Sequence, residues 1–158
     1  MKAASVKEIK NALADLKKEE LLAICTRLSK FKKENKELIT YILFDESDED
    51  GFVNNIQISI NEDFESLHVN NIYFAKKNIR KIVRTVNKYI KYSGKPSTEA
   101  ALLIHVCKQI KTSSLDIEKS QVLINIYKSL LKRIEKSIES MHEDLQYEFK
   151  NDLEEIFN

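Results

Sequence analysis

Residues that make tight turns are almost missing from this chain. Its 158 residues include two glycines, one proline and no tryptophan, whereas average usage is about 7% glycine and about 5% proline. A β-rich protein of this size needs many tight turns, which glycine, proline, asparagine and aspartate usually supply. The scarcity of glycine and proline therefore predicts long helices joined by short polar connections.

Long hydrophobic runs and a signal peptide are missing as well. The longest apolar runs, 39–44 and 100–104, are far shorter than the roughly 18–20 residues that a membrane span needs. Residues 1–10 carry charges early and have no apolar signal region. The chain has only two cysteines, Cys25 and Cys107. We interpret both as reduced core thiols of a cytoplasmic protein, with a disulfide as the open alternative.

Hydrophobic residues at helical spacing fill most of the chain. With 42% hydrophobic and 32% charged residues, residues 1–158 should fold as one soluble domain. Ser5 and Glu8 form a capping-box pattern at the start of a first helix. Periodicity predicts further helices from about residue 18, after the lysine-rich stretch 30–36, over 52–68, from 72 to about 92, and from 97 or 98 to about 111. Asn70 or Asn71 can cap the helix from 72, and Gly94 followed by Pro96 should end it before the next helix begins.

The stretch 52–68 carries two patterns. Ile56, Ile58 and Ile60 alternate, which is typical of a strand. Val53, Ile56, Ile60 and Phe64 also fit one face of a helix. A lone strand would have unpaired backbone groups and no partner in this chain, so the helix is favoured.

After residue 114 the chain has neither glycine nor proline, and its apolar residues repeat about every 3.67 positions. This predicts one helix of up to about 60 Å, or two collinear pieces. The expected fold is all-α, with six to eight helices in a compact array or short superhelix that ends in a long C-terminal helix. The apolar positions are Leu123, Tyr127, Leu130, Ile134, Ile138, Met141, Leu145, Phe149, Leu153 and Ile156.

Charge is distributed very unevenly, although the formal net charge is only +1. Residues 37–75 contain nine acids and no lysine or arginine, and residues 66–98 contain eight cations and no acid. At about 100° per residue, most of these cations gather nearly opposite the apolar side of the helix expected from Ile72. We call this set the basic face. It consists of Lys77, Arg80, Lys81, Arg84, Lys88 and Lys91, with Tyr73 inside the same arc.

The basic face supports several hypotheses. The favoured function is a non-catalytic protein–protein interaction or scaffold module that binds an acidic protein surface through residues 76–95. The alternative is a nucleic-acid-binding regulatory protein that uses the same face, with Tyr73 stacking on a base. Lipid headgroups and a plain solvated face, neutralised in part by the acids of 37–65, stay open. A homodimer could form through the C-terminal helix.

Metal-binding patterns in the chain are weak. Glu65–His68 and Glu139–His142 have the Glu-x-x-His spacing of di-iron helical bundles, so a helical-bundle metalloprotein is a remote alternative. On a helical wheel both glutamates point away from the apolar face. The segment 46–57 begins like a calcium-binding EF-hand loop, but its first residue is Glu46 and its twelfth is Gln57. We therefore expect no metal and no other cofactor.

Catalytic motifs are not recognisable either. His105 and Cys107 are two positions apart on a helix and point to different sides. Both lie in an apolar run, where core packing is expected rather than a zinc site or a Cys–His nucleophile. Gly-rich phosphate loops and nucleophile elbows are absent, so no catalytic residue is expected.

Four stretches look familiar when taken together: Glu37–Phe44, Asn71–Lys77, Asn87–Ser93 and His142–Tyr147. They resemble a family of uncharacterised bacterial all-helical proteins, and the likeness covers most of the chain. The family has no assigned activity, so the resemblance implies a bacterial cytoplasmic protein and no functional residues.

Overall fold

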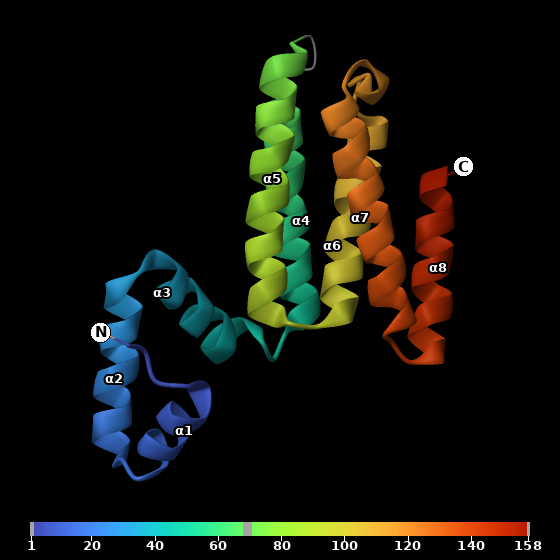
Figure 1. The fold of residues 1–158 in the computed structure, drawn as a ribbon. Coiled ribbons are helices and arrows are strands. Elements are labelled where there is room, and N and C mark those ends of the chain that lie inside the picture. The colour runs from blue at the N-terminus through green and yellow to red at the C-terminus, as the bar shows by residue number, and fades with distance from the viewer. Residues whose placement is uncertain (1, 68–70, 158) are drawn as a thin grey trace. The chain divides into compact units, whose positions relative to one another are not determined.

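The chain is all-α, as expected (Figure 1). A computed structural model describes residues 2–67 and 71–157, with side chains up to residue 154. Within these ranges there are eight α-helices, one π-helical segment, one 3₁₀ turn and no β-strand. None of the helices in the described ranges is long and apolar enough to cross a membrane. The predicted fold class and number of helices are therefore confirmed.

Two compact units make up the chain, Met1–Phe44 and Asp45–Asn158. That they form one domain stays a prediction. The smaller unit contains α1 (Val6–Ala14), α2 (Lys18–Phe31), α3 (Lys33–Thr40) and most of the π-helical segment Tyr41–Asp45. The larger unit contains α4 (Glu49–Glu65), α5 (Ile72–Ser93), α6 (Pro96–Thr112), a 3₁₀ turn (Ile117–Lys119), α7 (Gln121–Glu139) and α8 (Glu143–Phe157).

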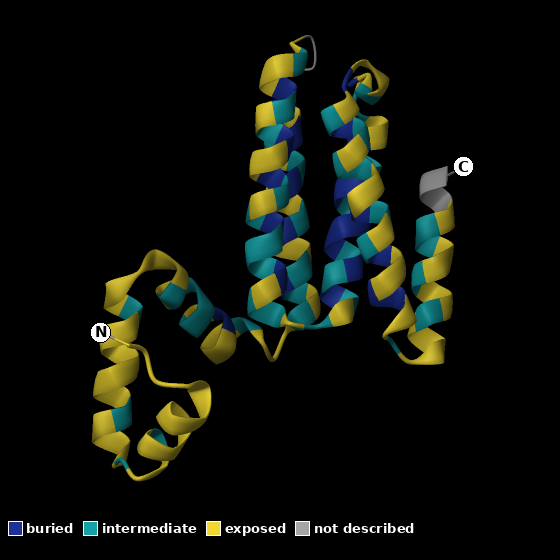
Figure 2. Ribbon diagram, in the orientation of Figure 1, coloured by how far each residue is buried: buried dark blue, intermediate teal, exposed yellow. Residues whose placement is uncertain are grey.

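The smaller unit buries very little. Its first helix begins with the predicted capping box, in which Ser5 Oγ accepts a hydrogen bond from Glu8 N at 3.3 Å and Ser5 N donates to Glu8 Oε2 at 2.7 Å. Among residues 2–44, Tyr41 alone is buried (Figure 2). The side chains of Leu22 and Phe31 are 66% and 75% exposed. The apolar side of α2 therefore packs much less than its periodicity predicts.

The core of the larger unit surrounds α6. This helix contacts α4, α5, α7 and α8, and a helix with neighbours on several sides must be apolar around most of its circumference. The sequence of α6 meets that demand. Its buried side chains are Thr98, Ala100, Leu102, Leu103, Ile104, Val106, Cys107 and Ile110.

Residues 52–65 are helical, which confirms the favoured interpretation over a strand. In α4 the side chains of Phe52, Ile56, Ile60 and Phe64 are buried at intervals of four residues. Ile58, the residue that suggested strand alternation, is 49% exposed. The helical pattern prevails because one side of α4 packs against α6.

The ends of α5 follow the predicted signals. Asn71 Oδ1 accepts hydrogen bonds from the backbone N–H groups of Tyr73 and Phe74, at 3.1 and 3.4 Å. The other candidate cap, Asn70, lies outside the described residues. Gly94 ends α5 with a φ of 66°, a left-handed conformation that suits glycine. Pro96, expected to precede α6, is its first residue, where its missing N–H costs no hydrogen bond.

The predicted long C-terminal helix is wrong. The helix is interrupted at residues 140–142, where the chain turns, and α8 then runs antiparallel to α7 and beside it (Figure 1). Side chains stabilise this break without glycine or proline. Ser140 Oγ donates to Ser137 O at 2.7 Å, and Gln146 Nε2 donates to Met141 O at 2.9 Å.

Candidate functional site

The basic face of α5 is exposed along the helix. Lys77, Arg80, Lys81, Arg84 and Lys91 are exposed, and Lys88 is partly buried. The opposite side of α5 is anchored in the core by Ala75, Ile79, Ile82, Val86 and Ile90. Because five apolar side chains fix the rotation of the helix, the cations cannot turn inward.

The aromatic residues near the basic face differ in exposure. The side chain of Tyr73 is 67% exposed and makes an edge-on contact with Phe74, with ring centroids 5.7 Å apart. Lys88 Nζ lies 4.9 Å from the ring centroid of Tyr89, and Tyr89 packs edge-on against Phe52 of α4 at 6.1 Å. Lys88 is therefore held along the helix surface, whereas Tyr73 projects freely.

Glu49, one of the acids of residues 37–65, forms an ion pair at the C-terminal end of the basic segment 76–95. Lys95 Nζ lies 2.6 Å from Glu49 Oε2, and Glu49 also accepts hydrogen bonds from Ser93 and Thr98. In contrast, Lys77, Arg80, Lys81 and Arg84 form no ion pair with any residue in the described ranges. Glu49 thus neutralises Lys95 at the turn between α5 and α6, whereas Lys77, Arg80, Lys81 and Arg84 keep their charge.

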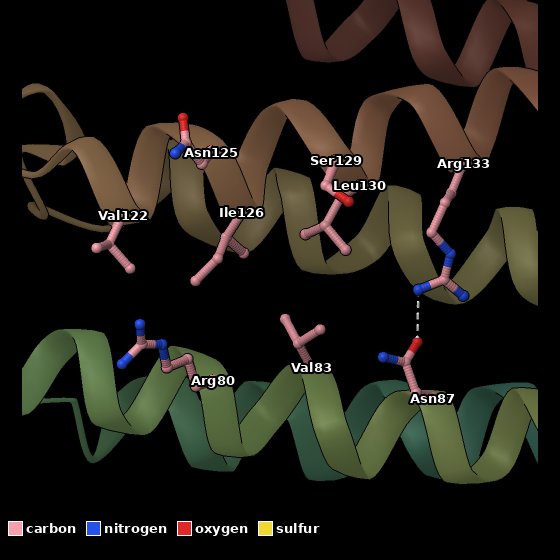
Figure 3. A pocket seen from close by; sticks show the side chains of 9 residues that line it. All are labelled: Arg80, Val83, Asn87, Val122, Asn125, Ile126, Ser129, Leu130 and Arg133. Atoms are coloured by element: carbon pink, nitrogen blue, oxygen red, sulfur yellow. Dashed lines mark hydrogen bonds between the residues drawn. The ribbon is translucent and has the colours of Figure 1, made fainter.

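A groove of about 450 Å³ runs beside the basic face, between α5 and α7 (Figure 3). Its middle is apolar, and an arginine lies toward each end of it. Arg80 comes from the basic face, and Arg133 comes from α7. The remaining lining residues are Val83, Asn87, Val122, Asn125, Ile126, Ser129 and Leu130.

Arg133 is held in place by three hydrogen bonds. Its Nε and Nη2 donate to Glu99 Oε1 at 3.0 and 2.6 Å, and its Nη1 donates to Asn87 Oδ1 at 2.7 Å (Figure 3). These bonds connect α7 to α6 and to α5. The side chain is still 35% exposed, so the guanidinium is preorganised and accessible at the same time.

A second hollow of about 300 Å³ shares Arg133 with the groove and continues along α7. Lys136 lines it, and Lys136 and the neighbouring Lys132 are both exposed. Neither lysine forms an ion pair with a residue that the structure describes. The groove therefore has one cation from each of the two helices that form it, Arg80 and Arg133, with apolar side chains between them, and Lys136 lines the adjoining hollow.

The site residues predicted from the sequence all lie on α5, and Arg133 of α7 was not among them. Lys128, Lys132 and Lys136 recur every four residues, which places them along one side of a helix. That spacing could have indicated a second basic stripe. Nothing in the sequence indicates that Arg133 reaches Asn87, because the two residues are 46 positions apart.

The metal-binding patterns do not converge on a site. Glu65 and Glu139 are exposed, and His68 lies outside the described residues. His142 Nδ1 lies 3.4 Å from Asp144 Oδ2 at the surface. In the described ranges, no group of three or more His, Cys, Asp or Glu side chains is placed to hold a metal ion.

The EF-hand-like segment acts as a helix start. Asp48 Oδ1 accepts a hydrogen bond from Gly51 N at 3.0 Å and caps α4. A Cβ at position 51 would collide with the Asp48 carboxylate, so a larger residue there would require this cap to shift. The carboxylate of Glu49 accepts hydrogen bonds from Ser93, Lys95 and Thr98. Asp48 therefore caps α4, and Glu49 connects α4 to the end of α5 and the start of α6.

His105 and Cys107 point to different surroundings, as predicted. Cys107 is fully buried, and burial raises the pKa of its thiol to about 12. His105 Nε2 lies 2.7 Å from Asn61 Oδ1, which also accepts from Gln109 Nε2 at 2.9 Å. Burial lowers the pKa of His105. The thiol of Cys107 is neutral and does not face the imidazole of His105, so these two residues do not form an activated nucleophile.

Cys25 corrects one sequence prediction. Both cysteines are free thiols, but Cys25 is exposed on α2 and not a core residue. Its place beside Leu21 and Leu28 in the apolar pattern suggested burial. The smaller unit simply does not cover that side of α2.

Comparisons of the chain with protein-family models, with curated proteins and with solved structures found no match.

Proposed function

We propose that the protein is a non-catalytic interaction or scaffold module that binds an acidic protein surface through the basic face of α5. One observation carries this proposal: Lys77, Arg80, Lys81 and Arg84 are exposed together and form no ion pair with described residues. A rigid helix that presents unpaired cations attracts an acidic partner and orients it before contact. A cytoplasmic setting, as the family resemblance implies, belongs to this proposal.

The groove beside the basic face favours a protein partner over a nucleic acid. Its middle is formed by Val83, Ile126 and Leu130 (Figure 3), which can contact apolar side chains of a partner. None of the described residues that line the groove is aromatic, so bases would find no ring there to stack on. A protein surface with apolar residues between acids matches the groove better.

Affinity recovery from native lysate tests the proposal. The binding variant replaces Lys77, Arg80, Lys81 and Arg84, all four exposed, by Glu. The matched control replaces four exposed lysines of the smaller unit, Lys7, Lys10, Lys18 and Lys30, by Glu, so that the net charge changes equally. The wild type and the control should recover the same partner, and the binding variant should lose it.

Both variants should keep a melting temperature within a few degrees of the wild type, because exposed charges contribute little to stability. Recovery of the same partner by the binding variant would reject the basic face as the binding site. Titration with short single-stranded RNA and DNA at low and high salt tests the alternative. Tight binding with a steep salt dependence that requires Arg80 and Arg84 would replace the proposal by a nucleic-acid-binding function.

A further inference from the structure

A second charged face lies on α8, and its charge is opposite to that of α5. Residues 143–157 contain six acids and one cation, Lys150. Asp144, Glu148 and Glu154 are exposed, and Tyr147 between them is 72% exposed. Phe149 and Leu153 on the other side are partly buried, consistent with the contacts of α8 with α6 and α7. We call Asp144, Glu148 and Glu154, with Tyr147 between them, the acidic face of α8, and its side chains project away from the core.

The two charged faces cannot meet within one molecule. α5 and α8 form opposite edges of the larger unit, with α6 and α7 between them (Figures 1 and 3). The acids of α8 therefore leave the basic face of the same molecule uncovered. A second copy can bring the two faces together, because each copy carries both.

We propose that the acidic face of α8 from a second copy docks in the groove between α5 and α7. This inference rests on the proposed function, because the same basic face does the binding. The groove is lined by Arg80 of α5 and Arg133 of α7, with Arg84 exposed on the neighbouring turn of α5 and Lys136 lining the adjoining hollow. These cations match the acids that flank Tyr147 on α8.

The spacing of the charged side chains is the same on the two faces. Asp144 and Glu148 of α8 are four residues apart, as are Arg80 and Arg84 of α5, so each pair spans about 6 Å along its helix. An exposed tyrosine between two acids suits a groove with an apolar middle and an arginine toward each end, since its ring is apolar and its hydroxyl can form a hydrogen bond.

The net charge of the chain also permits self-association. With a formal net charge of +1, two copies do not repel each other at long range, and a charge near zero favours association. Because the two faces lie on opposite edges, docking is head-to-tail and leaves a free basic face and a free acidic face at the ends. Such an interface adds further copies unless the rotation closes a ring.

Sedimentation velocity of the full chain over a range of concentrations tests the inference. One variant carries Arg80→Glu and Arg84→Glu, and another carries Asp144→Lys and Glu148→Lys. A control that matches the second variant in net charge carries Glu62→Lys and Glu65→Lys on the exposed side of α4. Measurements in about 50 mM and about 500 mM salt change the screening length from roughly 14 Å to roughly 4 Å.

The wild type and the control should form dimers and larger species as concentration rises, with association at least tenfold weaker in high salt. Each reversal variant alone should stay monomeric. An equimolar mixture of the two variants should associate again, because the intact acidic face of one variant meets the intact basic face of the other, and the two reversed faces are also opposite in charge. This recovery also shows that both variants are folded.

Three results would overturn the inference: a monomeric wild type at all concentrations in low salt, reversal variants that associate like the wild type, or a mixture that stays monomeric. The proposed function can survive such a failure. If the variant with Asp144→Lys and Glu148→Lys still recovers a foreign partner from lysate in a way that depends on Arg80 and Arg84, the basic face binds another protein and not a second copy.

Discussion

Arg133 Nη2 of α7 lies 2.6 Å from Glu99 Oε1 of α6, and the same guanidinium donates from Nη1 to Asn87 of α5. Three helices therefore meet at one side chain beside the groove. A hydrogen bond to a charged group contributes about 1.5–3 kcal/mol when it is shielded from water. The side chains of Arg133 and Glu99 are 35% and 26% exposed, so the lower part of this range applies.

Replacing Arg133 by Met should reduce the free energy of unfolding by about 1–2 kcal/mol, because it removes three hydrogen bonds and leaves Glu99 without its cation. Urea denaturation followed by circular dichroism measures this loss. The neighbouring Lys132→Met, on an exposed lysine, should change the free energy by less than about 0.5 kcal/mol. Equal effects of the two substitutions would mean that the bridge between the helices contributes no stability.

The two cysteines should react very differently with a thiol reagent. Cys25 is exposed and should be modified at once in the native protein, whereas Cys107 is fully buried. At pH 8 we expect one reactive thiol per chain in buffer and two in denaturant, counted with a chromogenic disulfide. The variant Cys25→Ser should show none in buffer. Rapid modification of Cys107 in the folded protein would contradict the packing of α6.

Burial of Cys107 should make stability fall at high pH. Its pKa is raised from 9.0 to about 12, so the unfolded chain releases a proton above pH 9 that the folded chain retains. The stabilising contribution is therefore complete below pH 9 and is lost as pH rises toward 12, by up to about 1.4 kcal/mol per pH unit. Denaturation at pH 8 and pH 10.5 should show a larger loss for the wild type than for Cys107→Ala. Parallel losses would contradict the buried thiol.

Burial of His105 should make the protein sensitive to acid. The pKa of His105 is lowered from 6.5, mainly because the charged imidazolium would lose its hydration. The unfolded chain then binds a proton more readily, so stability is present above pH 6.5 and declines as pH falls through the folded pKa. The variant His105→Gln should lose less stability between pH 7 and 5 than the wild type. An NMR titration that places the His105 pKa above 6.5 would contradict this account.

Much of the fold was predictable from local signals. The hydrogen-bonding partners of Ser5 and Asn71 lie within three residues, and the left-handed turn at Gly94 follows directly on its helix. The apolar periodicity of α5 also predicted correctly that Arg80 and Arg84 would be exposed. These features depend on neighbouring residues, so the sequence contains all that is needed to infer them.

The break between α7 and α8 was not predictable in the same way. Ile138, Met141 and Leu145 continue the apolar repeat across it, although Leu145 is 42% exposed in the structure whereas Ile138 is buried. The turn is stabilised by Gln146, whose side chain reaches back to Met141 O. A polar residue with this role cannot be told in advance from one in the middle of a continuous helix.

Half of the candidate site likewise depends on the tertiary structure. Arg133 lines the groove because α7 packs against α6 and faces α5 across the hollow, and Glu99 is 34 positions away in the sequence. Exposure of Leu22 and Phe31 could not be foreseen either, because periodicity shows which side of a helix is apolar and not whether anything covers it.

Amine footprinting by mass spectrometry most directly tests the claim that the basic face is a binding surface. The labelling rates of Lys77 and Lys81 are compared with those of Lys7 and Lys10, four exposed lysines, in dilute purified protein and in nuclease-treated native lysate. The account predicts similar rates for all four in dilute protein, and at least tenfold slower labelling of Lys77 and Lys81 alone in lysate. Equal labelling of the two pairs in lysate would contradict it.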